Sequence, residues 1–208
     1  MSIETSDEGA PFISDIAAIR QRARQHIEQG AVTPGYRANR QTVVDLLNEA
    51  LATELVCVLR YRRHYFMAHG VAAESIKKEF LVHAVEEQEH ADQIAKRIVE
   101  LGGEPNFDPD ELTSRSHAEY AAGKDLEDMI VEDLVAERIA IESYREMIEY
   151  IGPRDSTTRR MLEGILAVEE EHAEELGGML EDVQGVRKSQ RAPANSERRP
   201  EPVRHLVV

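Results

Sequence analysis

The chain has 208 residues, a formal net charge of −15 and one cysteine. This length fits one domain with appended segments, and the acidic balance argues against a surface that binds nucleic-acid phosphates throughout. A single cysteine excludes an intrachain disulfide and a four-cysteine metal site. No apolar run approaches the roughly 20 residues that span a bilayer, and the polar N-terminus does not resemble a signal peptide. We therefore expect a soluble cytoplasmic protein.

The first 36 residues predict an N-terminal arm with one short helix. Apolar residues recur at helical spacing between residues 14 and 29. Ser14 or Asp15 is placed to cap this helix, and Gly30 is placed to end it. We treat residues 1–36 as separate from the main domain.

Four long amphipathic segments follow, and they predict an antiparallel four-helix bundle over residues 37–184. The expected helices cover residues 40–69, 73–101, 125–151 and 156–183. Each has an interior without proline and would be about 40–45 Å long at the helical rise per residue. The connections within each pair are short, whereas residues 102–124 form a long crossover. Two helical hairpins joined by one long crossover is a known connectivity of all-α four-helix bundles.

Residues 185–208 predict a basic, flexible tail. They hold six Lys or Arg against two Glu and are rich in Arg, Pro and Ser. Such a tail could bind DNA or dock on another subunit, but it lacks the interleaved aromatic residues of many single-strand binders. An ordinary solvated tail is the alternative.

A metal-ligand pattern occurs twice along the bundle. In each half, an apolar helix carries a Glu followed seven residues later by a Tyr, and the next helix carries Glu-x-x-His. The spacing is nearly the same in both halves. The residues of the pattern are Glu54, Tyr61, Glu87 and His90 in the first half, and Glu137, Tyr144, Glu169 and His172 in the second.

The spacing of these acids and histidines favours a centre for two metal ions. Glu and His at positions i and i+3 lie on one helix face, so both can reach one point. Ionised carboxylates on such apolar faces would be very costly without pairing or metal coordination. Four carboxylates neutralise two divalent cations, and mixed oxygen and imidazole ligands suit iron or manganese without excluding zinc. The expected ligands are Glu54, Glu87, His90, Glu137, Glu169 and His172.

The two tyrosines lie two helical turns beyond their glutamates, on the same face. A buried tyrosine hydroxyl needs a partner, and a ligand carboxylate is a natural acceptor. Core packing explains Tyr61 and Tyr144 equally well. Cys57 stands among apolar residues and is expected to be a buried thiol.

The remaining acids and histidines near the motifs are expected to have ordinary roles. The acids that flank the motifs, Glu86 and Glu175 among them, indicate a solvated face. Histidines without a partner motif are expected on the surface or in packing, and they are His64, His69, His83, His117 and His205. A position near the metal site is the alternative for His83, because it precedes His90 by two helical turns.

These residues resemble the signatures of the bacterioferritin and ferritin-like family. Residues 48–55, 87–92, 101–106 and 169–172 are similar to the family's helix A, helix B, the turn after helix B and helix D. The resemblance covers about residues 40–183. It implies a ferritin-like bundle with a di-iron ferroxidase centre, in which Glu87 and Glu169 bridge two iron ions and Tyr61 stands beside them.

The chain also departs from the bacterioferritin pattern. Gln88 stands where haem-binding members have the methionine that ligates haem, so haem is not expected. The tail after residue 185 is a poor match for the family's fifth helix, and the N-terminal helix is additional. Both features are more similar to Dps-like ferritins, so we expect a 12-subunit cage, with a 24-subunit cage as the alternative.

The resemblance implies iron storage and detoxification. Fe(II) would be oxidised by hydrogen peroxide or dioxygen, and ferric mineral would collect in the cage, protecting the cell against oxidative stress. The alternative is a soluble di-iron or di-manganese peroxidase, catalase or oxygenase without storage. A large hollow assembly would favour storage, and a dimer would favour the alternative.

Overall fold

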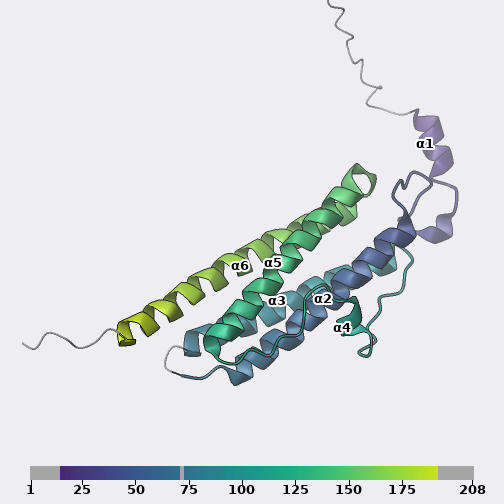
Figure 1. Cartoon of the computed structure of the whole chain (residues 1–208). Coiled ribbons are helices and arrows are strands. Elements are labelled where there is room, and N and C mark those ends of the chain that lie inside the picture. The colour runs from purple at the N-terminus through teal and green to yellow at the C-terminus, as the bar shows by residue number, and fades with distance from the viewer. Residues whose placement is uncertain (1–14, 71–72, 192–208) are drawn as a thin grey trace, which may run out of the picture.

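The computed structural model describes residues 15–70 and 73–191, with side chains to residue 186, and these residues form helices without strands (Figure 1). The expected all-α class and four-helix bundle are confirmed. The four long helices are α2 (Arg40–Met67), α3 (Ala73–Glu100), α5 (Leu126–Ile151) and α6 (Ser156–Arg191). Shorter elements are α1 (Ile16–Arg22), η1 (Ile27–Gln29), α4 (Leu112–Arg115) and η2 (Gly152–Arg154).

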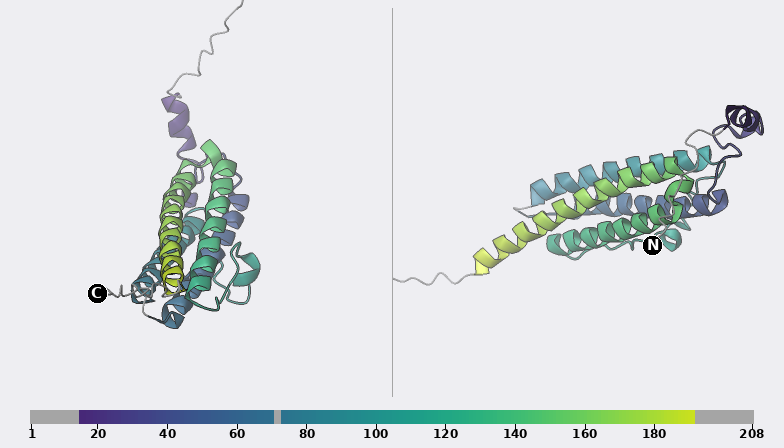
Figure 2. Two further views of the ribbon diagram at one scale, coloured as in Figure 1. Left: turned by 60° about the vertical axis from the view of Figure 1, so that its left-hand side comes forward. Right: turned by 90° about the horizontal axis from the view of Figure 1, so that it is seen from above.

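The bundle consists of two helical hairpins. Helix α2 packs along α3, and α5 packs along α6 (Figure 2). The long crossover between α3 and α5 returns along α2, where its short helix α4 packs. This connectivity makes the two hairpins face each other, so that the repeated motif of each hairpin points toward the other.

Side-chain caps and a glycine fix the limits of these helices. Asn39 accepts a hydrogen bond from the backbone N–H of Thr42 at the start of α2, and Asp125 does the same for Asp128 at the start of α5. Such caps satisfy backbone donors that have no partner within the helix. Gly152 follows α5 with φ of 51°, a conformation that costs glycine little.

Two apolar clusters fill the bundle on either side of a polar layer, which is formed by the buried acids and histidines of the repeated motif. One contains Leu47, Ile94 and Ile98, among others, and the second contains Phe80 and Leu176 among others. Cys57 belongs to the second cluster and is buried, as expected. Burial of these side chains stabilises the bundle and removes bulk water from the layer between the clusters.

A buried ionic network attaches the crossover to the bundle. Arg60 Nε donates to Asp133 Oδ1 over 2.8 Å, and His64 Nδ1 lies 2.8 Å from Asp133 Oδ2. Arg60 and His64 also contact the crossover carbonyls of Glu119 and Ala122. His64 is therefore part of a polar network rather than ordinary packing. A buried charge requires such compensation, so the network links α2, α5 and the crossover.

Two helix limits differ from the sequence prediction. The helix expected over residues 14–29 is shorter, because α1 ends at Arg22 and only the 3-10 turn η1 follows. None of the α1 side chains is buried, so no core contact supports a longer helix. Helix α6 continues through Gly185 to Arg191, since an interior glycine costs only about 1 kcal/mol.

The rest of the expected tail, from residue 192, lies outside the described residues, as do residues 1–14. In the part of the chain that the structure covers, every helix is too short or too polar to cross a membrane.

Candidate metal centre

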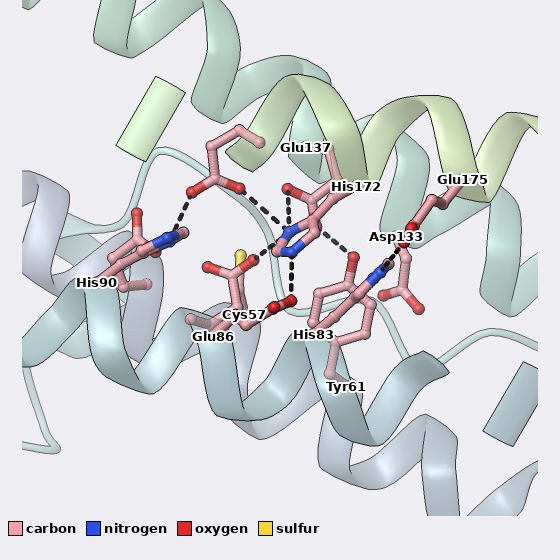
Figure 3. A network of polar contacts seen from close by, with 12 residues as sticks. Cys57, Tyr61, His83, Glu86, His90, Asp133, Glu137, His172 and Glu175 are labelled. Atoms are coloured by element: carbon pink, nitrogen blue, oxygen red, sulfur yellow. Dashed lines mark hydrogen bonds and ion pairs between the residues drawn. The ribbon is translucent and has the colours of Figure 1, made fainter. Parts of the chain in front are cut away.

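The six acids and histidines of the repeated motif converge in the polar layer at the middle of the bundle. Figure 3 labels three of them, His90, Glu137 and His172. Glu54 from α2, Glu87 and His90 from α3, and Glu169 from α6 form a first set, whose ligand atoms lie within 4.8 Å of one another. A second set, with the same limit on distances, contains Glu87, Glu169, Glu137 from α5 and His172 from α6.

Glu87 and Glu169 belong to both sets, so the two candidate positions share two carboxylates. All six residues are buried, with at most 4% of their surface exposed. The arrangement has the pseudo-twofold symmetry that the duplicated motif predicts, because each hairpin supplies one single Glu and one Glu-x-x-His.

The atoms that face the centre of the layer lack hydrogen-bond partners. They include a carboxylate oxygen of each Glu and Nδ1 of both histidines, and the full set is Glu54 Oε2, Glu87 Oε1, His90 Nδ1, Glu137 Oε2, both Glu169 oxygens and His172 Nδ1. Buried polar atoms are rarely left unpartnered in proteins. Oxygen and nitrogen atoms that converge in this way fit divalent cations of the iron, manganese or zinc type.

The two imidazoles point their Nδ1 atoms at the carboxylates. His90 Nδ1 lies 3.0 Å from Glu169 Oε1 and 3.4 Å from Glu54 Oε2. His172 Nδ1 lies 3.4 Å from Glu87 Oε1 and 3.6 Å from Glu169 Oε2. Each imidazole therefore faces one glutamate of its own hairpin and one Glu-x-x-His glutamate of the opposite hairpin.

Burial and mutual repulsion alter the acidity of the carboxylates. Burial, followed by the charges of Glu169 and Glu54, raises the pKa of Glu87 well above its ordinary value. Burial and the charge of Glu169 do the same to the pKa of Glu137. Four carboxylates this close cannot all be ionised without a cation, so the centre holds protons that a cation would displace.

Two members of the centre are better ionised than their burial suggests. Burial alone would raise the pKa of Glu54, but the adjacent Glu87 carboxyl and His90 imidazole outweigh it and lower that pKa. Burial would lower the pKa of His90, but the neighbouring carboxylates of Glu169 and Glu54 raise it to about 10. The Glu54–His90 side of the centre thus resembles an ion pair.

The two tyrosines bond across the bundle. Tyr61 donates its hydroxyl to Glu137 Oε1, and Tyr144 donates its hydroxyl to Glu54 Oε1. Each tyrosine therefore orients the single glutamate of the opposite hairpin, and its acceptor is a carboxylate of the candidate ligand set, as the sequence pattern suggested. Burial, and then the charge of the partner glutamate, raises the pKa of both tyrosines, so they remain hydrogen-bond donors.

Two further residues adjoin the centre, contrary to the expected ordinary roles. Glu86 Oε2 lies 2.9 Å from His172 Nε2, so this acid holds the outer nitrogen of a candidate ligand. A partner on the outer nitrogen is typical of metal-binding histidines, and that rule could have identified Glu86. The His83 ring stacks on the His172 ring, with 4.0 Å between centroids, which agrees with the alternative for His83.

The remaining histidines and Gln88 lie elsewhere. His69 Nδ1 contacts the carbonyl of Met67, and His117 contacts Ser143 near the crossover. His205 lies outside the described residues. Gln88 donates to Asp92 along α3.

Comparison with known proteins gives consistent matches over the bundle. Residues 44–186 match the family model described as ferritin-like domain. A bacterioferritin of Mycobacterium avium is 30% identical over 140 residues, which are 67% of this chain and 84% of that protein.

Solved structures show the same fold. The bacterioferritin-related protein from Bacteroides fragilis, described as a dodecameric thioferritin, has a TM-score of 0.71 and 31% identity, over 74% of this chain and 92% of that one. The Dps protein of Thermosynechococcus elongatus has a TM-score of 0.65 over 67% of this chain and 90% of that one, and its 20% identity supports the fold alone.

Proposed function

Since this chain belongs to the ferritin-like domain family, we propose that it is an iron-storage ferroxidase. Its substrate is Fe(II), which it oxidises to Fe(III) for deposition inside a protein cage. The observation that supports this proposal most directly is the convergence of six buried acids and imidazoles whose inward atoms have no hydrogen-bond partner.

The residues of the centre divide the work of holding two Fe(II) ions. Glu54 and His90 serve one ion, Glu137 and His172 serve the other, and the two carboxylates common to both sets would bridge them. Four carboxylates match the charge of two divalent ions, so the loaded centre is close to neutral within an apolar bundle. Two-metal sites generally hold their ions roughly 3.5–4 Å apart.

Proton release accompanies Fe(II) binding in this proposal. The protons retained by Glu87 and Glu137 and by the His90 imidazole leave when the carboxylates and the neutral imidazole become ligands. Tyr61 and Tyr144 hold the single glutamates in place by hydrogen bonds. Two Fe(II) ions supply the two electrons that reduce one molecule of hydrogen peroxide to water or one of dioxygen to hydrogen peroxide.

The experiment that tests this proposal measures Fe(II) oxidation by the assembled protein. Glu54→Ala and His90→Ala should each slow oxidation at least tenfold, an effect of the size seen when metal-site residues are removed. Glu89→Ala is the matched control, because Glu89 is exposed on the same helix as His90. Oxidation at the wild-type rate in both centre variants would refute the assignment. Parallel reactions with peroxide and dioxygen would identify the preferred oxidant.

The proposed assembly is a closed cage of twelve copies. It is supported by the likeness to the dodecameric protein from Bacteroides fragilis. Native mass spectrometry should find twelve subunits of 23.5 kDa each. A dimer would favour the alternative of a di-iron or di-manganese peroxidase, catalase or oxygenase. A 24-subunit particle would agree with iron storage but would show that the proposed number of twelve subunits is wrong.

Binding of DNA remains a weaker proposal for the basic tail. Its supporting observation is a 30% identical relative from Synechococcus, named a nutrient stress-induced DNA-binding protein. Deletion of residues 185–208, which hold all six basic residues of the tail, should remove any retardation of DNA in a gel at low salt, and a full-length protein that causes none would refute this role.

A further inference from the structure

A third group of metal-ligating side chains lies outside the six-residue centre. Glu79 and His83 come from α3 and Glu175 comes from α6, and their ligand atoms lie within 4.8 Å of one another. His83 Nε2 and Glu175 Oε2 are 2.9 Å apart. Helical spacing brings Glu79 and His83 together because they are four residues apart on one face.

His83 is an unusual residue for an ordinary surface ion pair. Its side chain is fully buried, with 0% of its surface exposed, whereas the Glu175 side chain is 45% exposed. The second nitrogen of the ring, Nδ1, has no hydrogen-bond partner among the described residues. Nε2, the nitrogen of this buried ring that faces Glu175, is the atom placed to ligate a cation held by the two carboxylates.

The two carboxylates of the group are accessible from solvent. Glu79 and Glu175 line an open groove of about 670 Å³ between α3 and α6. Asp182, about two helical turns beyond Glu175 on α6, lines the same groove. Three acids in one groove attract cations and repel anions. A hydrated cation can therefore reach Glu79 and Glu175, the two carboxylates beside His83, from the groove.

The inner side of the group touches the six-residue centre. The His83 ring stacks on the ring of His172, and Figure 3 shows His83 between His172 and Glu175. The group thus stands between the solvent-filled groove and a ligand of the proposed ferroxidase centre.

We propose that Glu79, His83 and Glu175 bind a third divalent cation of the class of Fe²⁺, Co²⁺ or Zn²⁺. Two carboxylates match the cation's charge, and the imidazole selects these metals over Mg²⁺ or Ca²⁺. Three protein ligands leave coordination positions for water, so the ion exchanges readily. A role as the position from which Fe(II) enters the centre rests on the proposed function, whereas the binding itself does not.

The test uses crystals of the assembled protein equilibrated with Zn²⁺ and anomalous diffraction at the zinc edge. The wild-type protein should show a peak among Glu79, His83 and Glu175 in addition to peaks at the six-residue centre. Glu79→Gln and Glu175→Gln should each weaken Zn²⁺ binding at this third position by about tenfold or more. The control Glu174→Gln, an exposed residue next to Glu175, should leave the peak unchanged.

The same maps separate this inference from the proposed function. A wild-type map with peaks at the six-residue centre and none at the third position would overturn the inference. A third peak that keeps its height in the Glu79→Gln/Glu175→Gln double variant would overturn it as well. In Glu54→Ala the peaks of the centre should weaken while the third peak stays, which is the result expected of an independent site.

Discussion

Removal of bound metal should make the stability of this protein depend on pH through its buried carboxylates. The pKa of Glu87 in the fold lies above its ordinary value of 4.5, so the folded state binds this proton more tightly than the unfolded state does. Stability that is present at low pH is therefore lost as the pH rises above about 4.5.

His90 acts in the same direction. Its pKa rises from 6.5 to about 10 in the fold, so its contribution is complete below pH 6.5 and is lost as the pH approaches 10. Glu54 has a lowered pKa and acts in the opposite direction, but only as the pH falls below 4.5. Between pH 6 and 8 the centre of the metal-free protein should therefore lose stability.

The size of the effect follows from proton linkage. Each proton that only the folded state retains contributes about 1.4 kcal/mol per pH unit. One such proton gives a loss of about 3 kcal/mol between pH 6 and 8 by the same relation. For a chain of this length, that loss lowers the melting temperature by about 6–12 °C.

Thermal unfolding followed by circular dichroism would measure this loss in chelator-treated protein. Zn²⁺-loaded protein is the first control, because ligated carboxylates hold no protons and its pH dependence should be smaller. Glu87→Gln is the second control, since it removes one of the repelling carboxylates and should raise the melting temperature of the metal-free protein at pH 8. Equal pH dependence in the metal-free, Zn²⁺-loaded and Glu87→Gln proteins would refute the reasoning.

Three substitutions test the surroundings of the centre. Tyr144→Phe should weaken Zn²⁺ binding by about 10–100-fold, since it removes the hydrogen bond that orients a ligand glutamate. The control Tyr120→Phe, at an exposed residue, should leave the affinity unchanged, and equal Zn²⁺ affinities of the two variants in calorimetry would contradict this. Glu86→Gln, which alters the contact to a ligand imidazole, should weaken binding by about tenfold, and unchanged affinity would count against that role. Asp133→Asn leaves the buried Arg60 charge uncompensated and should cost about 3–5 kcal/mol in denaturant unfolding; a loss below about 1 kcal/mol would show that the network contributes little.

The fold was largely predictable because the apolar residues of the sequence recur with the period of an α-helix, and the bundle consists of α-helices. Apolar residues at helical spacing, the cap at Asp125 and the glycine after α5 locate the long helices to within a few residues. The errors lie at both ends of the chain. The sequence pattern places a helix end at Gly185, although this glycine is tolerated inside α6. Helix α1 is shorter than predicted because no core contact supports a longer helix.

The convergence of the six motif residues was predictable because two matched copies of Glu-x-x-His leave few arrangements for buried charge. The partners of those residues were not. Glu86 and His83 reach His172 only through the angle at which α3 packs on α6, which spacing within one helix does not specify. The crossed bonds of Tyr61 and Tyr144 likewise depend on how the two hairpins face each other.

Diffraction at the iron edge, from crystals of the assembled protein equilibrated with Fe(II) without oxygen, tests the central claim most directly. We predict two iron peaks in the bundle interior, roughly 3.5–4 Å apart, with Glu87 and Glu169 between them. Iron that binds only at the surface, or a single peak that touches one hairpin alone, would contradict it.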